Sequence, residues 1–457
     1  MSKTEVSAEG KSGLSPYLWL VLAVGGLAVV SHGAGDLILQ RLSALEDTPT
    51  APVLAALVLF AACSFVSFYA TWKTPLPSFV VAIALGIAGH TLFAPIVANP
   101  VLLASLVTAS AAAILFGGGL EMPLRSFIRL SVKIALLALP GVLITGFAFS
   151  YLVAAIGPAL GFAVAPAVVI LLGAILASTD PAAIIPVLEH LRFKRRDAKD
   201  IVIAESALND VAGTLLTSVF LKLPLATIAL MAAYQSLATQ ETYRFLAEQT
   251  GYGLLFGVFG YVLLWLLSQL KRRHTSTFGA DQIYFLATPI LAFVGAAAFG
   301  GSGFLAAFTA GLLFHAEEHM AGIERFFFQV IDGVAKPVIF ILVGALVDLH
   351  ALIAYAPLGI AAALVFMFVI RPAMVFLMIG LYGLMGSSRG LSVRELFFIS
   401  FVRETGAIPA VLLITAVARL TMPLDGLVEI GMWVILLTLV VAPPLTPFVA
   451  RRLGIAE

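Results

Sequence analysis

Carboxylates and small polar side chains stand together at two places inside long apolar stretches of the chain. Ser178-Thr179-Asp180-Pro181 interrupts one stretch, and Glu205-Ser206-Ala207-Leu208-Asn209-Asp210 begins the next. On a helix, Glu205 and Asn209 would lie one turn apart. Carboxylate, hydroxyl and amide oxygens are hard ligands that suit a small cation, and soft ligands are missing from both motifs. The pattern therefore favours a small cation and no transition metal.

The first motif predicts a broken helix. Pro181 removes a backbone donor and clashes with the preceding turn. A break at membrane depth is tolerated only inside protein or beside a water-filled cavity, and it directs the partial charges of the half-helix ends at a substrate or ion. An ordinary proline kink is the alternative. The carboxylate of Asp180 at the break favours an ion site.

The second motif has a chemistry suited to exchange. A carboxylate that is removed from water holds a proton more readily than an exposed one. A single carboxylate that takes either a proton or a metal cation is the minimum requirement for exchanging the two. Asp210 and Glu205 are the candidates. The alternative is a buried polar network that only holds helices together.

Positive charge inside apolar stretches comes from Arg371-Pro372 and from Arg403-Glu404-Thr405-Gly406-Ala407-Ile408-Pro409. Arginine stays ionised when buried, so Arg371 beside Glu205 would form a mutually neutralising pair. The second of these motifs again carries glycine and proline in mid-span. Two broken helices in the two halves of a chain indicate a transporter with inverted repeats.

Other motifs receive structural interpretations. Asp332 and Lys336 stand four residues apart and can pair on one helix. His315-Ala316-Glu317-Glu318-His319 has a zinc-peptidase spacing, but it falls in a loop without an evident third ligand, so a metalloprotease is not expected. The glycine clusters 117–119 and 300–303 fit close helix packing better than phosphate binding.

Composition assigns these motifs to a membrane protein. The chain has 457 residues, of which 61% are hydrophobic and 11% charged, and its mean hydropathy is +1.08. Soluble proteins have about 25% charged residues. Lys and Arg number 26 against 25 Asp and Glu, a balance that excludes nucleic acid as a partner. Fourteen apolar windows predict an all-α polytopic fold of 13–14 transmembrane helices; they are 17–33, 52–71, 76–93, 99–119, 132–156, 160–189, 201–221, 251–270, 282–299, 302–314, 328–347, 353–384, 394–418 and 427–449.

The distribution of basic residues predicts the topology. Threading the chain through all windows leaves only Arg41, Lys222, Arg244 and Arg419 on one side and most other Lys and Arg on the opposite, cytoplasmic side. Both termini are then cytoplasmic, and 222–250 lies outside, with a short interfacial helix over 225–233.

The chain divides into three parts on this reading. Residues 1–50 hold the N-terminus and an extra span, 51–449 form the transmembrane domain, and 450–457 are a short cytoplasmic tail. The window 17–33 is short enough to be a signal-like segment. A retained span is favoured because no small-residue cleavage site follows it.

Six motifs, taken in order, resemble the cation:proton antiporters, specifically the NhaP-like electroneutral sodium/proton exchangers. The resemblance covers nearly all of the chain after residue 50. Its motifs are Leu115-Phe116-Gly117-Gly118-Gly119-Leu120-Glu121, Thr179-Asp180-Pro181, Glu205-Ser206 with Asn209-Asp210, Gly301-Ser302-Gly303-Phe304-Leu305-Ala306, Arg371-Pro372 and Gly406-Ala407-Ile408-Pro409.

The resemblance implies a homodimer in the cell (inner or plasma) membrane, with a dimerisation domain and a core in which two discontinuous helices cross near Asp180 and Gly406. It implies that Asp210 carries the ion or the proton, and that Thr179, Ser206, Glu205 and Asn209 coordinate or shape the site. It further implies that Asp180 balances half-helix N-termini and that Arg371 pairs with Glu205. An Asn209-Asp210 pair, in place of two aspartates, accompanies one-for-one exchange in this superfamily.

The chain departs from the family pattern at Arg403. In the usual pattern arginine directly precedes Gly-Ala-Ile-Pro, whereas here Glu404 and Thr405 intervene. Two residues are about 200° of helix, so Arg403 is expected to face away from its counterpart's position, with Glu404 as a local partner.

These observations predict a secondary active transporter, not an enzyme, that exchanges Na⁺ or Li⁺ for H⁺ at Asp210. A K⁺/H⁺ antiporter of the same fold is the alternative, and a passive channel or a sensor is a further one. No cofactor is expected beyond the transported ions, and the bilayer and a second copy of the chain are the expected partners.

Overall fold

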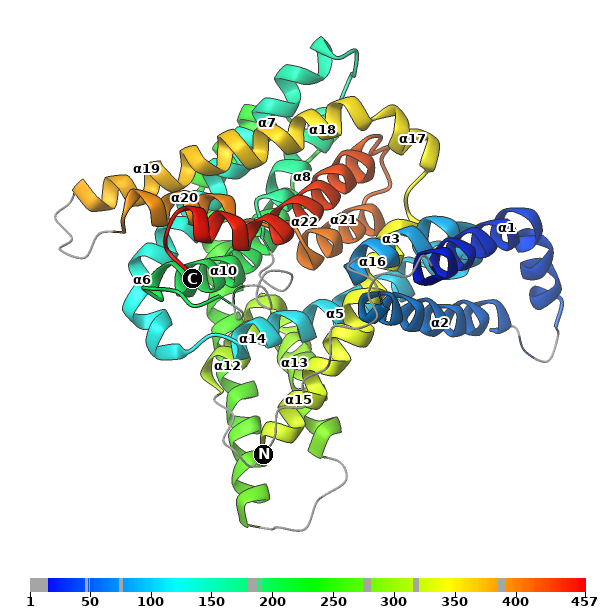
Figure 1. Ribbon diagram of the computed structural model, residues 1–457, viewed down its shortest axis with the longest axis horizontal. Coiled ribbons are helices and arrows are strands. Elements are labelled where there is room, and N and C mark those ends of the chain that lie inside the picture. Colours follow the sequence, from blue (N-terminus) through cyan, green and yellow to red (C-terminus); the bar gives the residue numbers. More distant parts are fainter. Residues whose placement is uncertain are drawn as a thin grey trace. The chain divides into compact units, whose positions relative to one another are not determined.

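A computed structural model describes residues 15–45, 48, 50–73, 77–179, 188, 191–273, 281–314, 320–384 and 391–457. These residues are helical or irregular, apart from one isolated antiparallel bridge between Phe193 and Ala456. The predicted all-α class is therefore confirmed (Figure 1).

The chain forms two compact units. The first consists of residues 1–103 with 332–347, and the second of 104–331 with 348–457. The first unit contains α1 (Ser15–Ser43), α2 (Ala51–Lys73), α3 (Ser78–Ala88), α4 (His90–Val97) and α16 (Lys336–Ala345).

Backbone packs directly on backbone in the first unit. A methyl group on Gly86 would collide with the Ile341 carbonyl, and one on Gly344 would collide with the Ile83 carbonyl. Two glycines facing each other thus let α3 and α16 approach more closely than larger residues would allow.

The window 76–93 is bent, which the sequence did not indicate. Helices α3 and α4 meet at Gly89 with an angle of 89° between them. His90, at the start of α4, has its Nδ1 2.6 Å from the carbonyl oxygen of Ala345. This bend is a third interrupted segment, in addition to the two breaks that the polar motifs predict.

The second unit carries the polar motifs. Its helices are α5 (Pro100–Leu120), α6 (Leu124–Ala138), α7 (Pro140–Ala159), α8 (Pro166–Leu176), α10 (Asp197–Phe220), α11 (Leu230–Gln235), α12 (Gln240–Arg273), α13 (Asp281–Ala298), α14 (Gly303–Leu313), α15 (Ala321–Val330), α17 (Leu349–Ala354), α18 (Ala356–Val365), α19 (Arg371–Leu384), α20 (Val393–Phe401), α21 (Ala407–Arg419) and α22 (Leu427–Arg452).

The glycine clusters pack helices, as predicted. On α5, a methyl group at Gly119 would collide with the carbonyl of Phe308, and one at Gly311 on α14 would collide with the carbonyl of Phe116. On α12, a methyl group at Gly253 would lie 3.0 Å from the Ser302 carbonyl oxygen. These contacts are between helices, so the glycines have a packing role.

Every predicted window contains helix, but not every window is a straight span. Among the described residues, nine helices are long and apolar enough to cross a membrane, and α3 with α4 adds a bent tenth. Helices α8 and α14 are short apolar helices of 11 residues each. The charged helix α10 and the pair α20–α21 account for the other two windows.

The second predicted break is present between α20 and α21. Helix α20 ends at Phe401, α21 begins at Ala407, and residues 402–406 between them are non-helical and buried. The first break begins where α8 ends, because Ser178 and Thr179 are non-helical and buried. The rest of that break, from Asp180 to 187, lies outside the described residues.

Proline also causes two π-helical turns. The turn η5 (Phe366–Ile370) precedes Arg371-Pro372, and η4 (Ile331–Ala335) precedes Lys336-Pro337. A proline has no N–H and its ring crowds the carbonyl four residues back, so the helix widens there by one residue. The predicted pair is present at η4, where Lys336 Nζ lies 2.6 Å from Asp332 Oδ1.

The loop between α10 and α12 differs from the prediction. The expected helix over 225–233 begins only at Leu230, and α11 continues through Gln235 into the 3-10 turn η2 (Ser236–Ala238). Pro224 and the turn that follows it keep residues 225–229 out of a helix.

Candidate ion-binding site

Helix α10 is the platform of the site. It is a 24-residue helix whose buried residues include Glu205, Ser206, Asn209 and Asp210. Their spacing brings the amide of Asn209 to Glu205, with 2.7 Å between Nδ2 and Oε1. The contact predicted from one helical turn is therefore present.

The end of α8 supplies the facing groups. Ser178 Oγ donates to Asp210 Oδ1 at 2.5 Å, and Ser206 Oγ donates to the Thr179 carbonyl at 2.8 Å. A methyl group on Gly213 of α10 would lie 2.7 Å from the Ser178 Cβ, so only glycine lets α10 come this close. The break in α8 and the carboxylate of Asp210 thus share one buried location.

Asn209 is held in a single orientation. Its Nδ2 donates to Thr179 Oγ1 at 2.9 Å as well as to Glu205. A carboxylate such as Glu205 accepts hydrogen bonds when it is ionised, which assigns the amide nitrogen to that side. The amide oxygen Oδ1 is buried and has no hydrogen-bond partner within the described part of the chain. It remains available as a ligand.

Glu205 is neutralised by Arg371 from α19. The two guanidinium nitrogens donate to the two carboxylate oxygens at 2.6 and 2.5 Å, and both side chains are 2% exposed. Arg371 also reaches the Ile399 carbonyl of α20 at 3.5 Å. A planar, two-pronged pair of this kind compensates both charges without water.

Arg403 caps the C-terminal end of α8. Its guanidinium donates to the carbonyls of Ala177 at 2.7 Å and Leu176 at 3.3 Å, and it lies 4.6 Å from the centre of the Phe366 ring. The last carbonyls of a helix carry partial negative charge and lack helical partners. Arg403 supplies both the charge and the donors at the place where the chain leaves the helix.

The expectation that Arg403 faces away, with Glu404 as its partner, rested on helical geometry that the chain does not have here. Residues 402–406 are non-helical, so a rotation of 100° per residue does not apply. The described partners of Arg403 are the α8 carbonyls and Phe366. Glu404 is itself 2% exposed within the same stretch.

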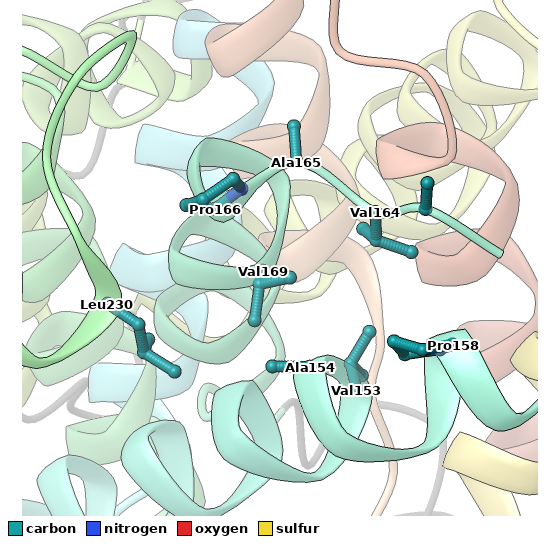
Figure 2. A pocket seen from close by; sticks show the side chains of 9 residues that line it. Val153, Ala154, Pro158, Val164, Ala165, Pro166, Val169 and Leu230 are labelled. Carbon is teal, nitrogen blue, oxygen red and sulfur yellow. The ribbon is translucent and has the colours of Figure 1, made fainter.

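A cavity elsewhere in the second unit is apolar. It measures about 370 Å³ and is lined by α7, by the chain entering α8 and by Leu230. Figure 2 shows Val153, Val164, Val169 and Leu230 among the side chains around it. The cavity adjoins the N-terminal end of α8, whereas Ser178 follows its C-terminal end. The side chains that line it are all apolar, so none of them is a ligand for a cation.

Two predicted motifs fall wholly or partly outside the described residues: Asp180 with Pro181, and the zinc-peptidase spacing at 315–319. Within the described ranges, three or more His, Cys, Asp or Glu side chains nowhere gather as a metal site would require.

Comparison with known families decides what class of protein holds this network. The family described as "Sodium/hydrogen exchanger, transmembrane" matches residues 54–452. This chain belongs to the sodium/hydrogen exchanger family. It is therefore an integral membrane cation/proton antiporter.

The fold of the exchanger is similar to that of a solved antiporter. The sodium proton antiporter MjNhaP1 from Methanocaldococcus jannaschii, at pH 8, matches with a TM-score of 0.64 and 22% identity over 88% of this chain and 98% of that one. An electron-microscopy map of MjNhaP1 gives a TM-score of 0.61, again at 22% identity, over 88% and 97% of the two chains. The NhaP-like fold expected from the motifs is confirmed.

Two features of the exchanger's site were not anticipated. The sequence does not predict a contact between Ser178 and Asp210, although the Ser178 hydroxyl donates to that carboxylate. The cap that Arg403 forms on α8 was also missed. The one available signal for Ser178 was its place next to Thr179 in the interrupted stretch, since helical spacing carries no information across a break.

Proposed function

We propose that the exchanger trades one Na⁺ for one H⁺ by alternating access, and that Asp210 binds each in turn. The observation that carries this proposal is the position of Asp210, which is 2% exposed and accepts a hydrogen bond from Ser178 at the broken end of α8. A titratable group at an interrupted helix is where a transporter binds its ion.

The contacts favour Asp210 over Glu205 as the exchanging group. Both oxygens of Glu205 are bonded to Arg371, so its charge is compensated whatever ion is present. Asp210 instead accepts from a hydroxyl, which can donate to a carboxylate or turn its lone pairs toward a proton or a cation. Ser178 can therefore serve the protonated, the ion-bound and the ionised state alike.

The neighbouring oxygens suit a small monovalent cation. Asn209 Oδ1 is buried without a described hydrogen-bond partner, and its amide is held from the opposite side by Thr179 and Glu205. Together with Asp210 and the hydroxyls of Ser178 and Thr179, it would give a set of hard oxygen ligands. Ser206 holds the Thr179 carbonyl in place. Asp180, which follows Thr179, belongs to the proposed site from its sequence position.

One exchanging carboxylate explains one-for-one exchange. An ionised carboxylate is costly to move through a medium of low dielectric constant, and either a proton or a Na⁺ cancels its single charge. The residue beside Asp210 is the neutral Asn209, so the pair holds one such charge. Only the loaded forms would then cross the barrier, and each turn would carry one positive charge in each direction.

The test is proton movement in liposomes that contain the purified exchanger. Gradients of Na⁺, Li⁺ and K⁺ are imposed in turn between pH 6 and 9, and the membrane potential is varied. Proton flux driven by Na⁺ or Li⁺ and unchanged by the potential is expected. Flux driven by K⁺ alone would identify a K⁺/H⁺ antiporter, and ion flux driven by the potential without a proton gradient would identify a channel. Absence of flux with all three ions would favour a sensor over a transporter.

We also propose how the exchanger assembles and how it is oriented in the membrane. The exchanger is a homodimer in the cell membrane with both termini on the cytoplasmic side, which the excess of Lys and Arg in the loops on that side supports. Mass measurement in nanodiscs and labelling of single cysteines introduced into 192–196 and 236–239 would test both. Labelling of residues 236–239 from the cytoplasmic side would contradict the proposed orientation.

A further inference from the structure

Three separated segments of the exchanger form one strongly basic surface, defined here as the basic patch. They are residues 192–196 before α10, Arg394 at the start of α20, and Arg451 with Arg452 at the end of α22. The exposed cations on them are Arg192, Lys194, Arg195, Arg196, Arg394, Arg451 and Arg452.

Tertiary contacts bring the segments together. The C-terminal residues pair with the loop before α10 through the Phe193–Ala456 bridge, a Lys194 N–H donating to the Ile455 carbonyl at 2.9 Å and a Glu457 N–H donating to the Arg192 carbonyl at 3.0 Å. The Phe193 ring meets the Phe398 ring of α20 at 5.6 Å between centroids. Figure 1 shows the C-terminal end of α22 beside α20.

Most of these cations have no acidic partner. Arg195 is paired, at 3.4 Å from Glu395 and 3.3 Å from Asp197. Arg192, Lys194, Arg196, Arg394, Arg451 and Arg452 form no ion pair with any residue that the structure describes. Uncompensated like charges held side by side repel one another, so the patch is suited to an anionic ligand.

Exposed aromatic side chains set the depth of the patch in the bilayer. Phe448 is 66% exposed one helical turn before Arg452, and Phe397 is 52% exposed one turn after Arg394. Exposed phenylalanines on a membrane protein contact lipid tails, and arginines one turn away reach the headgroup level. In a bilayer that covers these phenylalanines, the basic patch would lie at the level of the lipid headgroups.

We propose that the basic patch is a binding site for anionic phospholipid headgroups. Two or more phosphates would be held between the loop before α10 and the ends of α20 and α22. Clusters of four to eight cations at the membrane surface recognise acidic lipids in this way. Such a lipid would also clamp the loop before α10, the helix that carries Asp210.

The test compares lipids and matched variants. The purified exchanger in neutral detergent is titrated with phosphatidylglycerol or with phosphatidylcholine of the same acyl chains, and its thermal stability is followed. Phosphatidylglycerol should raise the melting temperature of the wild type, and phosphatidylcholine should not. Arg451→Gln with Arg452→Gln should weaken the half-maximal effect by about thirtyfold, since each cation contributes about 1 kcal/mol at an acidic surface.

A second double variant and a control make the result decisive. Arg196→Gln with Arg394→Gln takes its charges from the other two segments and should cause a similar loss. The control, Arg272→Gln with Arg325→Gln, removes two exposed arginines from α12 and α15 and should bind within about twofold of the wild type. An equal loss in the control, or a loss in only one patch variant, would refute an assembled site. Full stabilisation by soluble glycerol phosphate at the same phosphate concentration would refute a lipid ligand.

Discussion

Both partners of the Arg371–Glu205 pair are almost completely buried, so each depends on the other. Glu205→Gln or Arg371→Ala would leave one charge without its counter-charge in the interior. We expect a loss of about 3–5 kcal/mol of stability for either change. Asp210→Asn keeps the shape of its side chain and should cost much less. Thermal unfolding in detergent measures all three, and equal melting temperatures would contradict a buried ion pair that matters for folding.

Replacement of Arg403 should lower both the stability of the exchanger and its rate of exchange. Arg403→Gln would leave the last carbonyls of α8 without a charged donor, and hydrogen bonds to charged groups contribute about 1.5–3 kcal/mol. We expect lower stability and slower exchange. Arg419→Gln, an exposed arginine at the end of α21, is the control and should change neither by much. A melting temperature of Arg403→Gln equal to that of the wild type would contradict the capping role.

At the scale of helices, the surroundings of two glycines predict opposite changes in stability when each is replaced by alanine. Gly311→Ala would force α14 away from the Phe116 carbonyl of α5, and overpacking costs about 1–3 kcal/mol. Gly322→Ala on α15 meets nothing within 4 Å, and alanine favours a helix over glycine by up to about 1 kcal/mol. Thermal unfolding should therefore fall for the first and stay level or rise for the second. The same direction for both would contradict the packing account.

Helix α11 is anchored to α7 by Tyr234. Its hydroxyl lies 3.0 Å from Ser150 Oγ, and its ring meets those of Phe147 and Phe220 at 5.0 and 5.1 Å. Burial raises the pKa of Tyr234 above its ordinary value of 10.0, and the hydrogen bond with Ser150 opposes this only partly. The raised pKa means that the neutral phenol contributes stability below about pH 10 and that this contribution is lost as the pH rises further.

Tyr234→Phe tests this anchor. Loss of one hydrogen bond should cost about 1 kcal/mol at pH 8, and the variant should lose less stability than the wild type between pH 8 and pH 11. Tyr243→Phe is the control, because Tyr243 is 60% exposed. Unfolding curves at the two pH values make the comparison. An identical alkaline loss in the wild type and in Tyr234→Phe would show that the buried phenol does not contribute.

At the scale of the whole chain, apolar windows were sufficient to place the helices, because a span needs a run of about 20 apolar residues. They could not show the bend of 89° between α3 and α4, since both arms are equally apolar. Polar motifs mark the other two breaks, because Ser, Thr and Asp stand at the first and Arg, Glu and Thr at the second, and such residues are costly inside an apolar stretch.

The contacts of the site also fall into two groups, those that the sequence predicts and those that it does not. Contacts within α10, such as that of Asn209 with Glu205, followed from helical spacing. The pairing of Arg371 with Glu205, 166 residues away, followed from opposite charge and from family resemblance. Ser178 on Asp210 and Arg403 on α8 depend on non-helical backbone, for which a sequence has no regular period.

The proposed exchange requires a single carboxylate, Asp210, to carry both ions. The most direct measurement is Na⁺-driven proton flux in liposomes that contain the wild type, Asp210→Asn or Asp425→Asn, the last being the same chemical change at an exposed loop residue. We expect flux in the wild type and in Asp425→Asn, and none in Asp210→Asn although that variant unfolds at a temperature near that of the wild type. Flux at the wild-type rate through Asp210→Asn would contradict it.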